Sequence, residues 1–357
     1  MNGALRHVGS VFLKTRPVHL TFFVTRRCNL RCPFCFYREE QDALPGAPEL
    51  TLEEIRRVAR SLDRLLWVLF SGGEPFLRPD LTEVSGLFHD LNQPTFLTYP
   101  TNGQLPEVVA GTTEQILKRC PESTVVVKLS LDGAGAAHDT MRRAPGAFAR
   151  LMETYRRLAD LADRQPRLEV GFNTVFCAEN QWQMGAIIEL VAGLQGARSH
   201  TLSMVRGRGL GREGVDLGQY RSAVRQLEAR WRRRPERTHR FGGAGLKAAL
   251  DRLQRRLIHR TLLEGRRLIP CEAGRLSLVL SESGDLHPCE ERPERSLGNV
   301  REAGYDVPGM LRSGRGKAVR AAIEAGGCAC SHECNFVTNI LFNPRMAFSL
   351  LGEYGRT

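Results

Sequence analysis

Short apolar runs alternate along the first part of the chain with longer segments in which apolar residues recur every three or four positions. The run His19 to Thr25 is apolar, β-branched or aromatic almost throughout, which predicts a buried strand. Helical periodicity extends over residues 51–65, 81–91 and 151–163. The first of these segments opens with Thr51 and Glu54, a Thr-x-x-Glu pattern that predicts a helix start. Strands alternating with helices indicate a parallel sheet.

The pattern changes after Gly214, where we expect a domain boundary. Residues 216–267 are arginine-rich and have helical periodicity, including the segment Arg225 to Arg234 that contains Trp231. Charge runs are usually solvated, so we expect an exposed arginine face; a nucleic-acid or other anion-binding surface is the alternative. The expected organisation is a domain at 1–214, a basic helical bridge at 215–267 and a second domain at 268–357.

Bulk composition is that of an ordinary soluble protein, with 42% hydrophobic and 25% charged residues in 357. This length allows one large core and a small appended domain. No apolar run reaches the roughly 18 residues that span a bilayer, so we expect no membrane span. The net charge of +12 would attract nucleic acid, acidic lipid or anionic substrates, but on its own it does not choose among them.

Three cysteines follow the first strand closely. Cys28, Cys32 and Cys35 form a C-x3-C-x2-C triad at a strand end, where sites of parallel α/β folds commonly lie. Thiolates are the usual ligands of [4Fe-4S] clusters, and three ligands leave one iron open for other chemistry. A zinc site or buried free thiols are the alternatives. Structural zinc requires four ligands, and no fourth cysteine lies nearby.

Five more cysteines crowd into the last quarter of the chain, around an apolar segment at 276–280 and a turn at 283–285 that predict a hairpin. Disulfides are the alternative to a metal site, but the chain shows no secretory signal and the triad requires a reducing compartment, so we expect the cytoplasm. Isolated Cys120 and Cys177 are expected to be small buried hydrophobes. The five clustered cysteines are Cys271, Cys289, Cys328, Cys330 and Cys334.

The triad, with aromatic Phe34 before its third cysteine, resembles the signature of the radical S-adenosylmethionine (SAM) superfamily. A second motif strengthens the resemblance: the apolar segment 67–70 leads into Gly72, Gly73, Glu74 and Pro75. In that family such a turn holds the methionine amino group of SAM. The glycines permit close backbone approach, and the carboxylate suits an ammonium group. The resemblance implies a [4Fe-4S] cluster with an open iron and a partial (β/α)6 TIM-type barrel over about residues 15–212.

Other segments match the family in order. Residues 98–103 resemble the turn after the third strand, and 125–132, 170–175 and 202–207 resemble strands four to six. Relatives use polar side chains at these positions to hold SAM. For each such residue alone, a cap or turn role is an equal alternative. The resemblance assigns SAM contacts to Ser130, Asp132, Arg142 or Arg143, Asn173 and Arg206.

The C-terminal pattern C-x12-G-x4-C, with Gly284 between Cys271 and Cys289, resembles the SPASM and Twitch subfamilies. SPASM proteins hold two auxiliary clusters and need seven or more cysteines, so the five here imply one auxiliary [4Fe-4S] cluster in a C-terminal α+β domain. The spacing C-x-C-x3-C of the last three cysteines departs from both subfamilies. We expect Cys330 and Cys334 to complete the cluster and Cys328 to be spare, with His332 a polar surface residue.

The resemblance implies an enzyme that reductively cleaves SAM to a 5′-deoxyadenosyl radical and abstracts hydrogen from a substrate carbon, for oxidation or bond formation. An electron donor such as flavodoxin or ferredoxin is implied. The expected substrate is a ribosomally made peptide; because the triad starts at position 28, we expect no fused N-terminal recognition domain. Alternatives are a sugar, aminocyclitol or lipid-linked small molecule, RNA bound near Trp231, and a non-enzymatic cluster carrier, which would not need the Gly-Gly-Glu-Pro turn.

Overall fold

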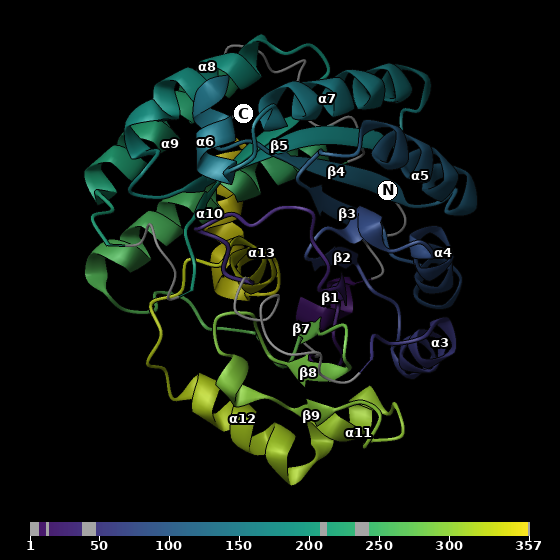
Figure 1. The fold of residues 1–357 in the computed structure, drawn as a ribbon. Helices are drawn as coiled ribbons and strands as arrows, with labels where there is room; N and C mark the ends of the chain where they lie inside the picture. Colours follow the sequence, from purple (N-terminus) through teal and green to yellow (C-terminus); the bar gives the residue numbers. More distant parts are fainter. Residues whose placement is uncertain (1–6, 12–13, 38–47, 208–212, 233–242, 356–357) are drawn as a thin grey trace.

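The centre of the molecule is one continuous sheet, with nine strands in the part of the chain that the computed structural model describes, namely residues 7–11, 14–37, 48–207, 213–232 and 243–355. The first six strands lie in chain order and pair in parallel, which confirms the predicted barrel class (Figure 1). They are β1 (His19–Thr25), β2 (Trp67–Gly72), β3 (Phe96–Thr101), β4 (Thr124–Ser130), β5 (Leu168–Phe176) and β6 (Ser199–Met204).

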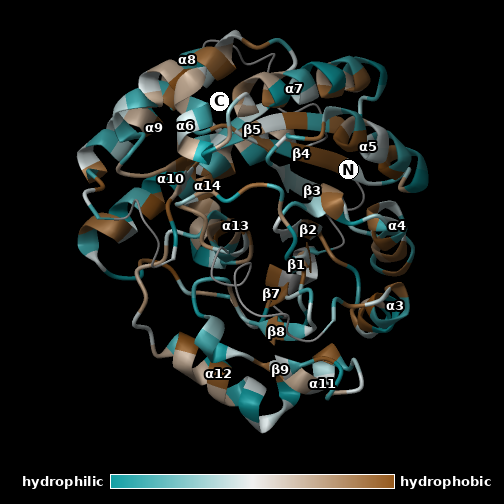
Figure 2. Cartoon of the chain, viewed as in Figure 1, coloured by the Kyte–Doolittle hydropathy of each residue, from teal (hydrophilic) through white to brown (hydrophobic). Residues whose placement is uncertain are grey.

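Helices cover the outer face of this sheet and carry both apolar and polar residues along their lengths (Figure 2). No described helix is long and apolar enough to cross a bilayer. The α-helices are α3 (Leu52–Ser61), α4 (Leu81–Asn92), α5 (Pro106–Arg119), α6 (Ala136–Arg142), α7 (Ala147–Arg164), α8 (Met184–Gly193), α9 (Leu217–Arg232), α10 (Ala244–Glu264), α11 (Val307–Arg312), α12 (Gly314–Glu324), α13 (Glu333–Leu341) and α14 (Ala347–Tyr354). Short 3-10 turns occupy Val8–Val11, Pro75–Leu77, Gln181–Gln183, Pro293–Arg295 and Pro344–Met346.

Local signals fix the start of α3 but not its end. The predicted capping box is present: Glu54 N donates to Thr51 Oγ1 at 3.3 Å, and Thr51 N donates to Glu54 Oε2 at 2.8 Å. The helix ends at Ser61 although helical periodicity continues to residue 65. The buried Asn92 amide donates to the carbonyls of Ala59, Leu62 and Asp63. A tertiary partner therefore satisfies the last carbonyls and allows the chain to turn into β2.

Alternation along the strands separates a packed outer face from a hollow interior. In β4, Val125, Val127 and Leu129 are fully buried beneath the helices, whereas Lys128 and Ser130 remain partly accessible and line a cavity. β2 has the same pattern over its first four residues. A closed (β/α)8 barrel fills this interior with branched side chains. Here the interior is instead a chamber.

The C-terminal region extends the barrel sheet. Strand β7 (Ser277–Leu280) pairs in parallel with β1, placing His19 opposite Ser277. The predicted hairpin is confirmed, since β8 (Asp285–His287) returns antiparallel to β7, and β9 (Gly298–Asn299) follows. The sequence assigned this hairpin to a separate domain; the structure joins it to the barrel through β1, because both faces of that strand are buried and its open edge takes a partner.

Two helices close the side of the barrel between β6 and β7. α10 and α13 contact each other, and Figure 1 shows α13 inside the arc of strands. Lys247, Leu250 and Gln254 of α10 share one helical face and line the chamber, as do Val337 and Leu341 of α13. The apolar segment 336–342 thus packs partly into the core and partly along the chamber wall.

The arginine-rich segment differs in part from a solvated face. Arg230 pairs with Glu189, and Arg252 is buried beside Glu353, where its Nη2 donates to the carbonyl at 2.7 Å. Trp231 packs partly buried against the core. Arg233 and Arg234, which a nucleic-acid surface would have used, lie outside the described residues.

Glu54 ties α3 to the C-terminal region, because Arg301 Nε donates to its carboxylate at 2.6 Å. The hydrogen bond from Arg301 lowers the pKa of Glu54 from its ordinary 4.5 to about 2, and this effect outweighs the opposing effect of burial. A carboxyl with a lowered pKa stabilises the fold above pH 4.5 and loses that contribution as the pH falls towards 2. We expect Glu54→Gln, which preserves the capping box, to cost about 1–2 kcal/mol at pH 7.

Urea unfolding of the wild type and of Glu54→Gln at pH 7 and pH 3 measures this loss of stability. The difference in unfolding free energy between the two proteins should be smaller at pH 3. Glu53→Gln is the matched control, since Glu53 pairs with Arg56 one turn away on the surface and its replacement should cost no more than about 0.5 kcal/mol. An unchanged difference at pH 3 would show that the ion pair is not the cause.

Candidate active site

A cavity of about 410 Å³ runs through the barrel interior, with the cysteine triad at its upper rim. It extends from the carboxyl ends of the strands, where Gly73 and Ser130 lie, down to Trp67 and Phe96 at the amino ends of β2 and β3. Catalytic groups of barrel enzymes gather at the carboxyl ends. The predicted site residues that line this cavity are Cys28, Cys32, Phe34, Cys35, Gly72, Gly73, Glu74, Ser130, Arg142, Asn173, Arg206 and Cys334.

Gly72 and Gly73 are required by the cysteine loop itself. Gly73 N donates to Thr25 O at 2.8 Å, and Glu74 N donates to Arg27 O at 2.8 Å. A Cβ on Gly73 would lie 2.2 Å from Arg27 O, and one on Gly72 would lie 2.2 Å from Thr25 O; Gly72 also has φ +125°. The paired glycines thus let the β2 turn pack directly on the backbone leading to Cys28. Pro75 is buried and starts the 3-10 turn that follows.

Glu74 is held rigidly beside this turn. Its side chain is 1% exposed and accepts from Thr101 Oγ1 and from Asn102 N, each at 2.8 Å. Burial raises the pKa of Glu74 from 4.5 to about 7, against the opposing effect of these hydrogen bonds. A buried carboxylate at the chamber wall can accept a cationic group, which would lower its pKa again.

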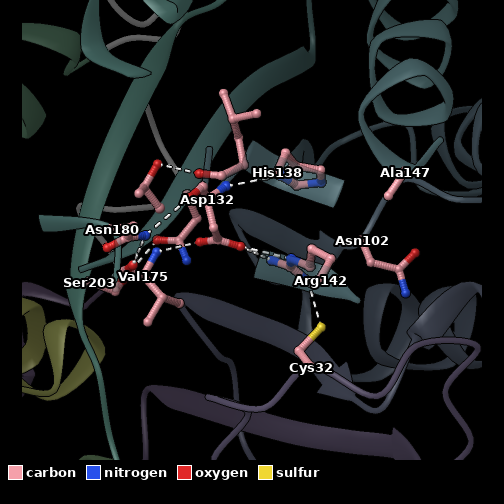
Figure 3. Close-up of polar contacts among 12 residues, drawn as sticks. Cys32, Asn102, Asp132, His138, Arg142, Ala147, Val175, Asn180 and Ser203 are labelled. Atoms are coloured by element: carbon pink, nitrogen blue, oxygen red, sulfur yellow. Dashed lines mark hydrogen bonds and ion pairs between the residues drawn. The ribbon is translucent and has the colours of Figure 1, made fainter. Parts of the chain in front are cut away.

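Asp132 contacts the cysteine triad through Arg142 and does not line the chamber itself. The strand expected at 125–132 ends earlier, because β4 stops at Ser130, so Asp132 lies beyond it. Its Oδ2 accepts from Arg142 Nε at 2.8 Å and its Oδ1 accepts from Val175 N at 2.8 Å. Arg142 Nη1 in turn reaches Cys32 Sγ at 3.6 Å (Figure 3). Asp132, fully buried and outside the cavity wall, therefore positions Arg142 against the triad.

The two candidate arginines differ in burial. Arg142 is buried, and its guanidinium lies 5.5 Å from the centre of the Phe34 ring. Arg143 is exposed and ends α6 in the left-handed conformation, at φ 51°. The structure thus brings only Arg142 to the chamber. Asn173 does line it, and its Oδ1 accepts from Ser203 Oγ at 2.8 Å.

Hydrogen-bond donors surround the triad sulfurs. Leu30 N lies 3.4 Å from Cys28 Sγ, and Asn102 Nδ2 lies 3.8 Å from it. Burial raises the pKa of the Cys35 thiol to about 11 and also raises that of Cys28. These thiols would be protonated at neutral pH without a metal, whereas the donors and Arg142 favour thiolates once a metal charge is present. The donor set therefore fits an iron-sulfur cluster.

No three His, Cys, Asp or Glu side chains in the described ranges converge on a point where one metal ion would bind. A closed zinc site needs such convergence. A four-iron cluster does not, because each thiolate binds a different iron.

A second charged group lies across the chamber from β4. Arg206, just past β6, donates from Nη1 to Glu290 Oε2 at 2.6 Å and stacks on Phe36, with 5.2 Å to the ring centre. His332 Nε2 lies 3.0 Å from the same Glu290 oxygen, and its Nδ1 accepts from Asn335 N. His332 is 2% exposed and caps α13, so the prediction of a surface histidine was wrong.

The C-terminal cysteines separate into two groups. Cys271 lies within electrostatic reach of Cys328 and Cys289, and Cys330 lies within reach of Cys271 and Cys289. Cys334 instead lines the chamber, where Glu290, Arg206 and Glu333 are its charged neighbours. All ten cysteines are free. Cys120 and Cys177 are fully buried, as predicted.

Two chamber residues had no place in the sequence prediction. Asn102 bridges the β2 turn to the triad loop, because its Nδ2 donates to Asn29 Oδ1 at 2.7 Å. Its position directly after β3 was a usable signal, since site residues follow strand ends. Lys128 faces the chamber from within β4. For a lone lysine in an apolar strand, the only guide in the sequence is that successive side chains alternate between the two faces of the strand.

Residues 22–191 match the family model described as the Radical SAM superfamily. The chain is 26% identical over 298 residues to the antilisterial bacteriocin subtilosin biosynthesis protein AlbA of Bacillus subtilis (strain 168), covering 81% of this chain and 59% of that protein. It is 29% identical over 217 residues to an AdoMet-dependent heme synthase of Methanosarcina barkeri, covering 59% and 57%. The chain thus spans less than two thirds of the length of these curated relatives.

Solved structures share the fold. A structure of native anSMEcpe with bound AdoMet and Cp18Cys peptide has a TM-score of 0.62 at 16% identity, covering 95% of this chain and 99% of that one. A structure of Streptococcus suis SuiB bound to the precursor peptide SuiA has a TM-score of 0.55 at 15% identity, covering 82% and 64%. At these identities the likeness establishes the fold.

Proposed function

Because residues 22–191 match the model of the Radical SAM superfamily, we propose that the chain is a member of that superfamily and an enzyme that modifies a peptide by radical chemistry in a reducing compartment, the cytoplasm. The observation that carries the proposal is the triad at the rim of an interior chamber, with Arg142 directed at Cys32. When bound, a reduced [4Fe-4S] cluster and SAM supply a 5′-deoxyadenosyl radical that abstracts hydrogen from a substrate carbon.

The chain's own residues hold and orient these groups. Cys28, Cys32 and Cys35 would bind the cluster, leaving one iron open. Glu74 would receive the methionine ammonium, and its hydrogen bonds from Thr101 and Asn102 fix its direction. The residues of α10 and α13 that line the chamber would limit the access of water, which protects reactive species.

Ser130 and Asn173 are proposed contacts for the rest of SAM, because both line the chamber one strand apart and pair in register. Arg142 would contribute positive charge beside Cys32, and Asp132 would hold that arginine in place. Arg143 is not retained in this set. Arg206 stands opposite, beside Glu290 and Glu333, and is better placed to meet the substrate.

For the auxiliary cluster we propose Cys271, Cys289, Cys328 and Cys330, in place of the set with Cys334 that the spacing favoured. The electrostatic interactions of Cys271 with each of the other three, and of Cys289 with Cys330, support this choice. Cys334 would then be a chamber thiol available to substrate. A bound auxiliary cluster would accept or deliver an electron, and an electron donor such as flavodoxin or ferredoxin is required to reduce the first.

Peptide as the substrate class is supported by the relatives' own names: AlbA in bacteriocin biosynthesis, and the peptide-bound anSMEcpe and SuiB structures. The test is anaerobic reconstitution followed by addition of dithionite and SAM, with 5′-deoxyadenosine measured by chromatography. We expect its formation, increased by a peptide substrate, with a mass change in that peptide. Absence of 5′-deoxyadenosine from protein with a full iron content would overturn the proposal.

A further inference from the structure

Lys128 is a cation inside the chamber that has no carboxylate at contact distance among the described residues. The chamber's other cations are paired: Arg142 with Asp132, Arg206 with Glu290, and Lys247 with Asp251. Within the described part of the chain, Lys128 Nζ donates to two hydroxyls, Ser199 Oγ at 2.5 Å and Thr201 Oγ1 at 3.4 Å. An ammonium group has three donors, so one remains for a ligand.

The surrounding backbone is shaped for this lysine. Gly171 of β5 lies opposite Lys128 in the sheet register. A Cβ at Gly171 would stand 2.3 Å from Ser199 Oγ and 3.0 Å from Lys128 Nζ. Three neighbouring strands thus contribute a lysine, an absent side chain and a hydroxyl to one spot. Such a spot is a built feature rather than a lysine that happens to be enclosed.

Enclosing this charge is costly, which argues for a compensating use. Lys128 is only partly accessible from the chamber, so it loses part of its hydration, and hydroxyl dipoles replace only some of what is lost. Burial, with a further contribution from Lys247, lowers the pKa of Lys128 from 10.5 to about 8, against the opposing effect of the Asp251 and Glu169 carboxylates, neither of which is at contact distance among the described ion pairs. The group therefore remains mostly charged at neutral pH and favours an anion beside it.

The position of the lysine defines what can reach it. Lys128 precedes Ser130 by two residues, so its backbone lies about 7 Å deeper in the barrel. The walls at and below this level are largely apolar, including Leu69, Val126 and Leu250. A single point charge matches a monoanion; a phosphate dianion calls for several donors or a guanidinium fork.

We propose that Lys128 is a substrate-binding residue that receives a carboxylate, carried on an apolar stem, inside the barrel. This inference rests on the proposed function, because it names the group that the chamber admits from the substrate. On a peptide, an acidic side chain or the C-terminal carboxylate has this chemistry.

The test uses three probes on the reconstituted full-length protein: hexanoate, its neutral analogue hexanamide, and hexyl phosphate. Binding is measured by calorimetry or ligand-observed NMR. We expect hexanoate to bind about tenfold or more tighter than hexanamide, and this preference to vanish in Lys128→Met. Lys128→Arg should keep it, which separates loss of charge from misfolding. Lys118→Met is the matched control, since Lys118 is exposed and pairs with Glu114 on α5.

Equal binding of hexanoate and hexanamide to the wild type, or a preference that survives in Lys128→Met, would overturn the proposal. Tighter binding of hexyl phosphate than hexanoate would overturn the assignment to a carboxylate. The same preparation is assayed for 5′-deoxyadenosine. SAM cleavage without a carboxylate preference removes this inference alone, whereas a preference without cleavage removes the proposed function and leaves the anion site.

Discussion

Changing Cys28, Cys32 and Cys35 together to Ala is expected to lower the iron content of the reconstituted protein from about eight to about four per chain and to abolish SAM cleavage. The triad lies at the rim of the chamber, whereas Cys271, Cys289, Cys328 and Cys330 form a separate group outside the chamber lining. Iron and sulfide analysis with Mössbauer spectra measures the loss. A wild type with only about four irons, and a variant with none, would eliminate the auxiliary cluster.

Two single variants identify the auxiliary ligands within the same experiment. Cys328→Ser should disturb the second cluster, whereas Cys334→Ser should keep about eight irons, because Cys334 lines the chamber beside Glu290 and Arg206. The reverse result would return Cys334 to the ligand set and leave Cys328 as the spare thiol. Cys120→Ser serves as a control for reconstitution, since Cys120 is fully buried in the core away from both sites.

Asp132→Asn is expected to destabilise the protein by about 3 kcal/mol or more, because removing one partner of a buried pair leaves the other charge uncompensated. Asp132 is fully buried and Arg142 is 8% exposed. Asparagine keeps the shape and the acceptor for Val175 N but not the charge. Urea unfolding of the metal-free protein measures the effect.

Asp90→Asn is the control, since its pair with Arg119 is half-exposed and should cost at most about 1 kcal/mol. If Arg142 is positioned by Asp132, the variant should also change the absorption or EPR spectrum of the reconstituted cluster, which a purely structural loss would not do. Equal costs for the two variants, with an unchanged spectrum, would exclude this role.

The parts of the site that could be predicted are those encoded locally. The triad, the Gly-Gly-Glu-Pro turn and the α3 capping box each lie within a few residues, and β1 has its predicted bounds. What could not be predicted depends on distant partners. The choice between Arg142 and Arg143 is made by Asp132, and the end of α3 by Asn92.

The direction in which some side chains point could not be predicted from the sequence either. Cys330 and Cys334 are four residues apart, but Cys330 lies in the loop before α13, whereas Cys334 faces the chamber from α13 on the same face as Val337 and Leu341. In the sequence, Lys128 is a charged residue in an apolar strand with no evident role. Its place becomes clear only in the structure, where α10 and α13 leave the barrel interior hollow. Spacing alone carries no information about which side of a helix another element covers.

The parallel pairing of β1 with β7 has a consequence for biogenesis. The edge of β1 that pairs with β7 stays uncovered until Ser277, the partner of His19, has been synthesised. The nascent barrel therefore leaves the ribosome with an unprotected apolar edge, and such edges promote intermolecular pairing. The high contact order of this single strand pair predicts that fragments ending before residue 277 aggregate, and that the full chain gains protease resistance only late in translation.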